Sequence, residues 1–381
     1  MKPKFYITTT VAGTLFFFEG QPRLWKEKFD VCAISSEKEE LVAFAEGEGI
    51  KYKYMPMHRE ISLVSDAINL FRFIWLFIKD RPFIVHGNTP KASVLSMIAA
   101  RVTGRPVRIY MCHGLRYETT SGILRKFLKA MEWLSCHCAT QVICVSHGVL
   151  EHLVGDGLCP NRKGILVGYG SAGGIDTNHF SREAIQDIPD VRDELGLSRD
   201  AFVFCFVGRV VRDKGVNELV AAFNRLSCEK SSIYLLLIGP QEKKLDPVNE
   251  ETQNIINNNP NIIALGHQTD VRPFLRASDA FVLPSYREGL GQVLLEANAM
   301  GVPCIASDII GPRDVIEPGQ NGELVESRSV DSLYIKMREW VENPMKVRSL
   351  SLSCRQYIME RYTTKTVRNT YYKFYCKITD N

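Results

Sequence analysis

The sequence predicts an α/β fold made of two doubly wound, Rossmann-like domains in series. The chain has 381 residues, more than one typical domain core holds. Short apolar runs alternate with helical patterns, and this alternation indicates a parallel sheet covered by helices on both faces. It stops in a glycine-rich segment at 168–176 and begins again near Ala201. We expect an N-terminal domain over 1–175, a C-terminal domain over 176–360, and a last helix over 361–381 that packs back toward the first domain.

The first domain is expected to contain seven strands and five helices. The strands are predicted at 4–10, 31–35, 52–55, 83–86, 107–111, 141–146 and 164–168. The helices are predicted at 37–48, 61–79, 91–103, 122–135 and 148–153.

The second domain repeats this organisation. Its strands are predicted at 201–208, 233–238, 261–265, 280–283 and 303–307, and its helices at 216–228, 247–257, 271–277, 293–300 and 330–342. Ligands of open α/β sheets bind at the carboxyl ends of the strands, so we expect the site in the cleft between the two domains.

The composition excludes several broad classes of function. The chain is 45% hydrophobic and 24% charged, and a formal net charge of +4 gives no general affinity for nucleic acid. Most of the cysteines lie in apolar, strand-like runs, and we expect them to be reduced core residues of a cytosolic protein. The most apolar helical run, 70–78, is too short to cross a bilayer, which takes ~20 residues.

Two carboxylates, Glu288 and Glu296, lie eight positions apart near the start of a predicted helix. Gly289 and Gly291 occupy the turn that precedes this helix. Free backbone N–H groups and the positive end of the helix dipole attract phosphate at a helix N-terminus, and nearby carboxylates can hold sugar hydroxyls. The segment therefore favours a nucleotide-sugar site. A plain strand-to-helix turn with a solvated glutamate is the simpler alternative.

Two cations follow the first strand of the second domain. Arg209 and Lys214 lie on one loop after Gly208, at the same predicted sheet edge as Glu288. An arginine fork and a lysine point charge could hold a diphosphate, although a solvated basic loop is the alternative. No DxD, HxH or HExxH pattern is present, so we expect no metal ion. The cations and the helix N-terminus could balance the charge of a leaving diphosphate.

Strand ends of the first domain carry further candidates. Gly13 follows the first strand and could let the backbone approach a phosphate, although a lone glycine is more often only a turn. His113 follows the strand at 107–111, with Gly114 next to it and Arg116 nearby, which favours a histidine that faces the cleft over one in the core. Weaker candidates at similar positions are His86, His147 and Glu118.

The segment 122–134 has the pattern of a basic amphipathic helix. Its apolar residues fall on one face, and Arg125, Lys126 and Lys129 fall on the other. Such a helix, with Arg116 close by, can lie on an anionic membrane surface. A helix packed on the core with a solvated basic face explains the pattern equally well.

The motifs of the second half resemble those of the GT-B glycosyltransferases of family four, retaining enzymes that use nucleotide-activated sugars. Gly208-Arg209 with Lys214-Gly215 is similar to the family's G-R-x-x-x-x-K-G loop, and Glu288 to Glu296 fit its E-x(7)-E motif. The segment 173–176 is similar to its N-G-x-D linker, with Gly173 in place of the usual asparagine. The resemblance is strongest from 165 to 325. In the first half, 86–91 and 113–118 resemble bacterial enzymes that extend lipid-linked capsule, O-antigen or glycan precursors.

The resemblance implies a role for each candidate. Arg209 and Lys214 hold the diphosphate and stabilise the leaving group. Glu288 binds hydroxyls of the donor sugar, Glu296 binds the ribose, and His113 approaches the sugar near the reacting carbon. The other donor-binding positions that it implies are Gly13, Gly208, His267, Gly289, Leu290 and Gly291.

The expected activity is retaining transfer of a hexose or N-acetylhexosamine from a UDP-sugar to a polyprenyl-diphosphate-linked glycan, in capsule, O-antigen or exopolysaccharide synthesis. The resemblance implies no cofactor and a cytoplasmic enzyme at the inner face of the plasma membrane. Two alternatives remain: a sugar-nucleotide epimerase of the same architecture, which needs no acceptor, and a non-catalytic sugar-nucleotide-binding subunit. The presence of both cations and both carboxylates argues against the second.

Overall fold

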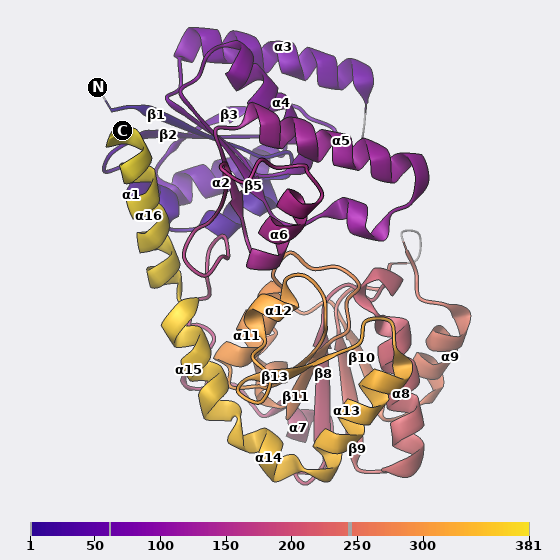
Figure 1. Ribbon diagram of the computed structural model, residues 1–381. Helices are drawn as coiled ribbons and strands as arrows, with labels where there is room; N and C mark the ends of the chain where they lie inside the picture. The colour runs from indigo at the N-terminus through magenta and orange to yellow at the C-terminus, as the bar shows by residue number, and fades with distance from the viewer. Residues whose placement is uncertain (1, 61, 243–245, 381) are drawn as a thin grey trace. The chain divides into compact units, whose positions relative to one another are not determined.

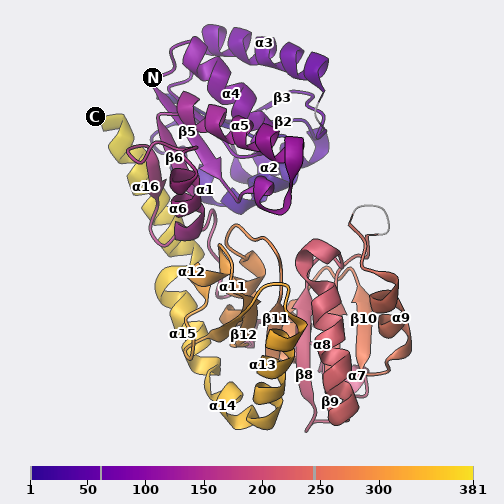
Figure 2. The same cartoon turned by 45° about the vertical axis from the view of Figure 1, so that its right-hand side comes forward.

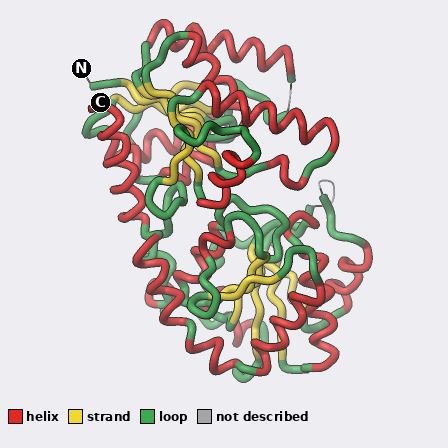
Figure 3. Tube along the Cα trace, viewed as in Figure 1, coloured by secondary structure: helices red, strands yellow, loops and turns green. Residues whose placement is uncertain are grey.

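Two parallel sheets, each enclosed by helices, form the fold (Figure 3). The computed structural model describes residues 2–60, 62–242 and 246–380. It divides into unit 1, with residues 1–174 and 365–381, and unit 2, with residues 175–364. The predicted fold class, two doubly wound α/β domains, is confirmed.

The sheet of unit 1 has the order β3-β2-β1-β4-β5-β6-β7 and is parallel throughout. Its strands are β1 (Lys4–Thr8), β2 (Asp30–Ser35), β3 (Lys51–Tyr54), β4 (Ile84–Gly87), β5 (Val107–Cys112), β6 (Gln141–Cys144) and β7 (Gly164–Leu166). The strand order reverses between β1 and β4, so the loops that follow these strands diverge there. Such a switch point is where open α/β sheets bind ligands.

Helices cover both faces of this sheet (Figures 1 and 2). In chain order they are η1 (Ala12–Phe18), α1 (Gln21–Trp25), α2 (Lys38–Glu48), α3 (Leu63–Asp80), α4 (Pro90–Val102), η2 (Arg116–Thr119), α5 (Gly122–Cys138), α6 (His147–Gly155) and α16 (Thr364–Asp380). Successive strand residues point to opposite faces. On β1, Phe5 therefore meets Trp25 and Tyr375, whereas Tyr6 meets Phe77 of α3.

The last helix, α16, packs on the core of unit 1 through its tyrosines. The Tyr375 hydroxyl lies 2.9 Å from Nε2 of the fully buried His86, and the Tyr371 hydroxyl donates to the carbonyl of Ser171 at 3.0 Å. Burial lowers the pKa of His86 to about 3, so this imidazole is neutral. His86 is a core residue that holds α16, and its prediction as a weaker site candidate is wrong.

The sheet of unit 2 has the order β10-β9-β8-β11-β12-β13 and reverses between β8 and β11. Its strands are β8 (Phe202–Val207), β9 (Ile233–Ile238), β10 (Ile262–Gly266), β11 (Ala280–Leu283), β12 (Cys304–Ser307) and β13 (Gly322–Val325). β13 was not predicted from the sequence. It is short, starts at a glycine and carries little apolar alternation, so its pairing with β12 comes from the tertiary fold.

The helices of unit 2 were predicted only in part. In chain order they are η3 (Glu183–Ile185), α7 (Val191–Glu194), η4 (Arg212–Lys214), α8 (Val216–Glu229), α9 (Glu250–Asn258), α10 (Arg272–Arg276), α11 (Gln292–Ala299), α12 (Pro312–Val315), α13 (Val330–Glu342), α14 (Pro344–Ser349) and α15 (Ser351–Arg361). Five of them were predicted, namely α8, α9, α10, α11 and α13, whereas α15, with 11 residues, and several short helices were not. α8 packs with α9 and α13, and α11 packs with α15. Among the described residues, no helix is long and apolar enough to cross a membrane.

The glycine at 173, where the resembling family usually has asparagine, has a steric explanation in unit 1. A Cβ atom at Gly173 would lie 2.1 Å from the carbonyl oxygen of Phe17 in η1. The backbone of η1 leaves no room for any side chain at this position, so the asparagine cannot be accommodated here.

The anchoring of α16 yields a stability prediction. Replacing Tyr375 by phenylalanine leaves buried Nε2 of His86 without its partner, and an unsatisfied buried polar group costs about 1–3 kcal/mol. Tyr375→Phe should lower the free energy of unfolding by that amount in urea denaturation. Tyr372→Phe, which removes the more exposed bond to Glu27 on the same helix, should change it by less than ~0.5 kcal/mol. Equal effects of the two substitutions would contradict the role of His86.

Candidate active site

The strongest cluster of predicted residues lies in unit 2, at the switch point of its sheet. The loop after β8 carries Arg209 and Lys214, and the loop after β11 carries Glu288. Because β8 and β11 are parallel neighbours, both loops leave the same sheet edge. The structure joins them directly, since Lys214 Nζ lies 2.5 Å from Glu288 Oε1 and both side chains are largely buried.

Further contacts hold these two loops together. The backbone N–H of Tyr286 donates to the carbonyl of Asp213 at 2.9 Å, and Arg287 Nη2 donates to the Asp213 carboxylate at 3.1 Å. Gly215 has φ +69°, and a Cβ there would lie 1.9 Å from the carbonyl oxygen of Pro284. Only glycine fits a position with both constraints, so the loop after β8 reaches Glu288 because residue 215 has no side chain.

The turn before α11 presents unpaired backbone donors. Gly291 caps the helix with φ +89°. The backbone N–H groups of Gly289, Leu290 and Gly291 donate to no other described residue. Three free donors at a helix N-terminus, with Lys214 next to them, form a local site for an anion.

The loop after β12 supports this turn from the other side. Gly311 has φ +88°, and a Cβ there would lie 2.9 Å from the carbonyl oxygen of Glu288, the carbonyl carbon of Gly289 and the nitrogen of Leu290. Gly311 thus fixes the backbone that presents the free N–H groups. The sequence analysis did not single it out, although the Gly311-Pro312 pair is a recognisable turn signal.

Glu296 lies in α11 without a partner. Its carboxyl group bonds to no side chain or backbone group among the described residues. Burial raises the pKa of Glu296 to about 7. A half-buried carboxyl group without a neutralising partner can accept hydrogen bonds from ligand hydroxyls, and its protonation changes near neutral pH.

The remaining predicted residues of unit 2 lie along the same edge. The Arg209 side chain is half exposed and lies 3.8 Å from the Glu242 carboxylate, too far for a strong pair. The carbonyl oxygen of Gly208 packs closely on Gly239, where a Cβ would lie 1.9 Å from it, whereas a Cβ at Gly208 itself would lie 3.3 Å from the ring of Phe206. His267 is exposed directly after β10, with its side chain bonded to no other described residue.

In unit 1, His113 lies where the loop after β5 meets η1. Its ring centroid is 5.8 Å from that of Phe17 and 6.2 Å from that of Phe18. Nε2 of His113 is buried and has no hydrogen-bond partner among the described residues. Burial lowers the pKa of His113 to about 4, so the imidazole is neutral at physiological pH. Each of the two histidines keeps one buried ring nitrogen without a partner among the described residues, Nε2 in His113 and Nδ1 in His86, but only the His86 ring bonds to α16.

Gly13 is the weakest of the candidates in unit 1. It lies in η1, is exposed, and a Cβ there would meet nothing within 4 Å. The fold of this unit therefore gives no steric reason for glycine at 13. His147 is also exposed, at the start of α6 and 3.6 Å from Glu151.

The basic helix predicted at 122–134 is α5, and its charged residues differ in their surroundings. Lys129 pairs with Asp156 at 3.0 Å and lies over the ring of Tyr117, so it is used within the unit. Arg116, Arg125 and Lys126 are exposed. Ile123 and Leu124, expected on the apolar face, are exposed as well. Core packing therefore explains only part of this helix.

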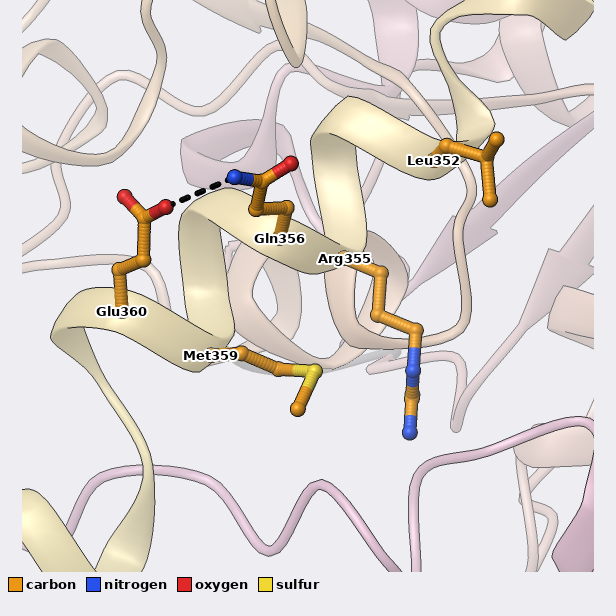
Figure 4. A pocket seen from close by; sticks show the side chains of 5 residues that line it. All are labelled: Leu352, Arg355, Gln356, Met359 and Glu360. Atoms are coloured by element: carbon orange, nitrogen blue, oxygen red, sulfur yellow. Dashed lines mark hydrogen bonds between the residues drawn. The ribbon is translucent and has the colours of Figure 1, made fainter.

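Other features of the described residues, including a polar pocket of about 710 Å³ that Arg182, Asp279 and Arg348 help to line, contain none of the predicted residues. No group of three or more His, Cys, Asp or Glu within the described ranges is arranged to hold a metal ion. A pocket of about 510 Å³ is lined by residues of α15 alone (Figure 4). In it, Arg355 is occupied by the carbonyls of Thr177, Phe180 and Ala299. This pocket carries none of the predicted residues.

Comparison with known proteins decides the family. The model of the family described as Glycosyl transferases group 1 matches residues 187–358, and that of Glycosyltransferase Family 4 matches residues 22–165. The capsular polysaccharide biosynthesis glycosyltransferase CapM of Staphylococcus aureus is 31% identical over 96% of this chain and 94% of its own length. The protein is a family-four glycosyltransferase.

A second relative and a solved structure agree with this assignment. The UDP-Gal:alpha-D-GlcNAc-diphosphoundecaprenol alpha-1,3-galactosyltransferase of Escherichia coli is 28% identical to this chain. The match covers 88% of this chain and 86% of the Escherichia coli enzyme. The crystal structure of Anabaena HepE in complex with UDP and glucose has a TM-score of 0.80 at 18% identity and covers 98% of this chain and 100% of its own. This last likeness concerns the fold, which is GT-B.

The support that Gly311 gives to the turn of this glycosyltransferase yields a prediction. In Gly311→Ala the new Cβ must displace the backbone at 288–290, and a misplacement of ~1 Å in a catalytic site can reduce the rate about a hundredfold. We expect a turnover roughly ten to a hundred times lower, measured as sugar transfer.

Gly319→Ala is the matched control for this substitution. Gly319 also has a positive φ, +78°, but a Cβ there meets nothing within 4 Å. It should show the backbone strain of about 1–3 kcal/mol in urea denaturation and retain its turnover. A normal rate in Gly311→Ala would contradict the supporting role.

Proposed function

We propose that this glycosyltransferase moves a hexose or N-acetylhexosamine from a UDP-sugar to a polyprenyl-diphosphate-linked glycan, with retention at the anomeric carbon. The observation that carries the proposal is the Lys214–Glu288 pair next to the free N–H groups of residues 289–291. It combines cationic and backbone donors for a diphosphate with a carboxylate for sugar hydroxyls. UDP and glucose in HepE, and the diphosphoundecaprenol acceptor named for the Escherichia coli relative, support the choice of substrates.

Each part of the donor is assigned to a different group. Arg209 and Lys214 bind the diphosphate, and Glu296 accepts hydrogen bonds from the ribose hydroxyls. Glu288, held at one oxygen by Lys214, binds hydroxyls of the sugar with its other oxygen. The turn at residues 289–291 and Gly208 lie near the sugar and phosphates, and His267 lies near the base. By the family resemblance, Gly13 and neutral His113 contact the donor from unit 1.

The chemical step breaks the bond between the anomeric carbon and the diphosphate oxygen. The electron pair leaves with the diphosphate, and the developing charge is stabilised by Arg209, Lys214 and the free N–H groups. The acceptor hydroxyl forms the new bond on the same face of the sugar and passes its proton to the departing phosphate oxygen. These donors supply the positive charge that the step requires, so the proposal includes no metal ion or other cofactor.

Glu288 is assigned to binding and not to nucleophilic attack. A carboxylate that attacks the anomeric carbon on the retaining path must be a good nucleophile, and the ion pair with Lys214 lowers the nucleophilicity of Glu288. The 2.5 Å contact with Lys214 instead fixes the carboxylate next to the diphosphate donors. This placement suits recognition of hydroxyl groups.

The acceptor places the enzyme at a membrane. A polyprenyl chain lies in the bilayer, and we propose that the protein acts at the cytoplasmic face of the plasma membrane, in capsule, O-antigen or exopolysaccharide synthesis. The name of CapM supports polysaccharide synthesis. Unit 1 is assigned to the acceptor and unit 2 to the nucleotide sugar.

The proposal is tested by mass spectrometry of products from a panel of UDP-, GDP- and dTDP-sugars with polyprenyl-diphosphate-linked acceptors. We expect one UDP-sugar to extend an acceptor with the α-configuration of the donor retained. Conversion of a nucleotide sugar without any acceptor would instead indicate an epimerase. Tight binding of the nucleotide without turnover on any acceptor would indicate a binding subunit.

The assigned cations make a prediction on rate. Arg209→Ala or Lys214→Ala removes a donor that stabilises the leaving group, and the loss of one such donor reduces turnover by ~10²-fold or more. The measurement is the initial rate of sugar transfer. Arg212→Ala is the control on the same loop, because exposed Arg212 is paired with Asp246 at 2.9 Å and should tolerate removal. Near-normal rates for Arg209→Ala and Lys214→Ala would overturn the diphosphate role.

The raised pKa of Glu296 makes a prediction on pH. Ribose hydroxyls bind better to the carboxylate than to the protonated acid, so the affinity for UDP-glucose, whose diphosphate does not titrate near neutrality, should rise with pH through about 7. With a pKa of about 7, the ionised fraction of Glu296 rises from about a tenth at pH 6 to about nine tenths at pH 8. If only the carboxylate binds the ribose, the affinity rises roughly tenfold over this range. Isothermal titration calorimetry at the two values measures it.

Two variants isolate the contribution of Glu296. Glu296→Gln should bind UDP-glucose more weakly at pH 8 and lose the pH dependence. Glu132→Gln is the control, because burial also raises the pKa of Glu132 to about 7, but its carboxyl group accepts from the Tyr110 hydroxyl at 2.5 Å inside unit 1. Unaltered affinity in Glu296→Gln would exclude the ribose role.

A further inference from the structure

Helix α3 carries a stripe of exposed apolar side chains on its outer face. Val64, Ile68, Phe71, Trp75 and Ile78 are each between 47% and 75% exposed. At 3.6 residues per turn, their spacing of four and three places them within roughly 80° of arc. The buried residues of α3 lie on the opposite side: Asn69, Phe73, Leu76 and Phe77. The outer stripe is therefore not the face by which α3 packs on unit 1, and a large exposed apolar patch marks an interaction surface.

The charges that border this stripe are positive. Arg72 and Lys79 are exposed beside it, and Lys79 Nζ lies 4.9 Å over the ring of Trp75. The two acidic residues of α3 are occupied within the unit. Asp66 pairs with Lys91 at 2.8 Å, and Asp80 accepts from the Tyr6 hydroxyl at 2.5 Å. The outer face of α3 thus combines apolar contact with a positive border.

The first turn of α5 has the same combination of exposed apolar and basic side chains. Figures 1 and 2 show α3, α4 and α5 side by side in one layer. α3 and α5 each follow a parallel strand, so both begin at the carboxyl edge of the sheet. Ile123 is 88% exposed there, Leu124 is also exposed, and Arg125 and Lys126 follow. The one acidic residue of α5, Glu132, is buried.

We propose that the outer face of α3, with the first turn of α5, docks on the surface of an anionic bilayer. An apolar stripe that includes a tryptophan, with lysine and arginine at its border, is the pattern of a helix that lies in the membrane interface. The surface gives unit 1 a defined orientation on the membrane. This docking proposal deepens the proposed function. It rests on the proposed function only for the lipid-linked acceptor, because docking itself needs no substrate.

The test is flotation of the full-length protein with vesicles of phosphatidylcholine, with and without about 30% phosphatidylglycerol. The protein should bind the anionic vesicles more strongly. Phe71→Gln with Trp75→Gln should lower the partition coefficient about tenfold or more, because two large apolar side chains no longer enter the interface. Binding should also shift the tryptophan fluorescence to the blue, and Trp75→Phe should remove most of this shift.

The matched control is Leu352→Gln with Met359→Gln on α15, which removes two exposed apolar side chains from unit 2 (Figure 4). This variant should bind vesicles as the unaltered protein does. Equal vesicle binding by the α3 variant would overturn the proposal, and so would absence of vesicle binding by the unaltered protein. A dimer in sedimentation experiments that dissociates in the α3 variant would also overturn it, because a second copy would then cover the stripe.

A short-chain, water-soluble acceptor separates this proposal from the proposed function. The α3 variant should transfer sugar to such an acceptor at the normal rate and lose activity only on acceptors in vesicles. Normal transfer without vesicle binding by the unaltered protein would overturn the docking and leave the reaction intact. Vesicle binding without transfer to any acceptor would leave the docking intact and overturn the reaction.

Discussion

The proposed donor site in unit 2 depends on one close approach, between the loop after β8 and the loop after β11. Gly215 lies so near the Pro284 carbonyl that any side chain at 215 would displace one of the loops. Lys214 is the neighbour of Gly215 and is thereby delivered to Glu288. The contact of Asp213 with Tyr286 continues the junction on the other side. Steric exclusion at one glycine thus sets the position of both the principal cation and the principal carboxylate.

The charged groups at this junction differ in how strongly each is paired. Lys214 and Glu288 balance one another, Arg209 is held only loosely by Glu242, and Glu296 has no partner among the described residues. In the proposed donor complex, the diphosphate would meet one cation that is nearly free and one that is shared with a carboxylate. In this proposal the sharing is favourable, because Lys214 would contact the diphosphate while it still orients Glu288 toward the sugar. The same proposal assigns Glu296 to the ribose of the nucleoside alone.

The sequence was sufficient to predict the alternation of strands and helices and to single out the residues that follow β8 and β11. Periodicity and strand ends are local signals, which a sequence shows directly. The sequence was insufficient where the role of a residue depends on a contact with a residue far along the chain. His86 ends a predicted strand, His113 follows one, and each precedes a glycine, yet the bond to Tyr375, far along the chain, shows His86 to be a core residue. Asp213 and Gly311 escaped notice for the same reason, since their importance lies in the backbone that they touch in another loop.

Helix α3 shows that the sequence is also insufficient to predict which side chains form an exposed surface. The run at 70–78 could be judged too short to cross a bilayer, but its apolar residues cannot be divided into an inner and an outer set until the packing on unit 1 is known. In α5, a basic amphipathic pattern suggested a membrane face, but in the structure Lys129 of this helix is paired with Asp156. What distinguishes the two helices is exposed apolar area, which is large on α3 and confined mainly to the first turn and Trp133 on α5. Positive charge concentrates a protein at an anionic surface, whereas apolar burial holds it there, so α3 is the element expected to determine residence on the membrane.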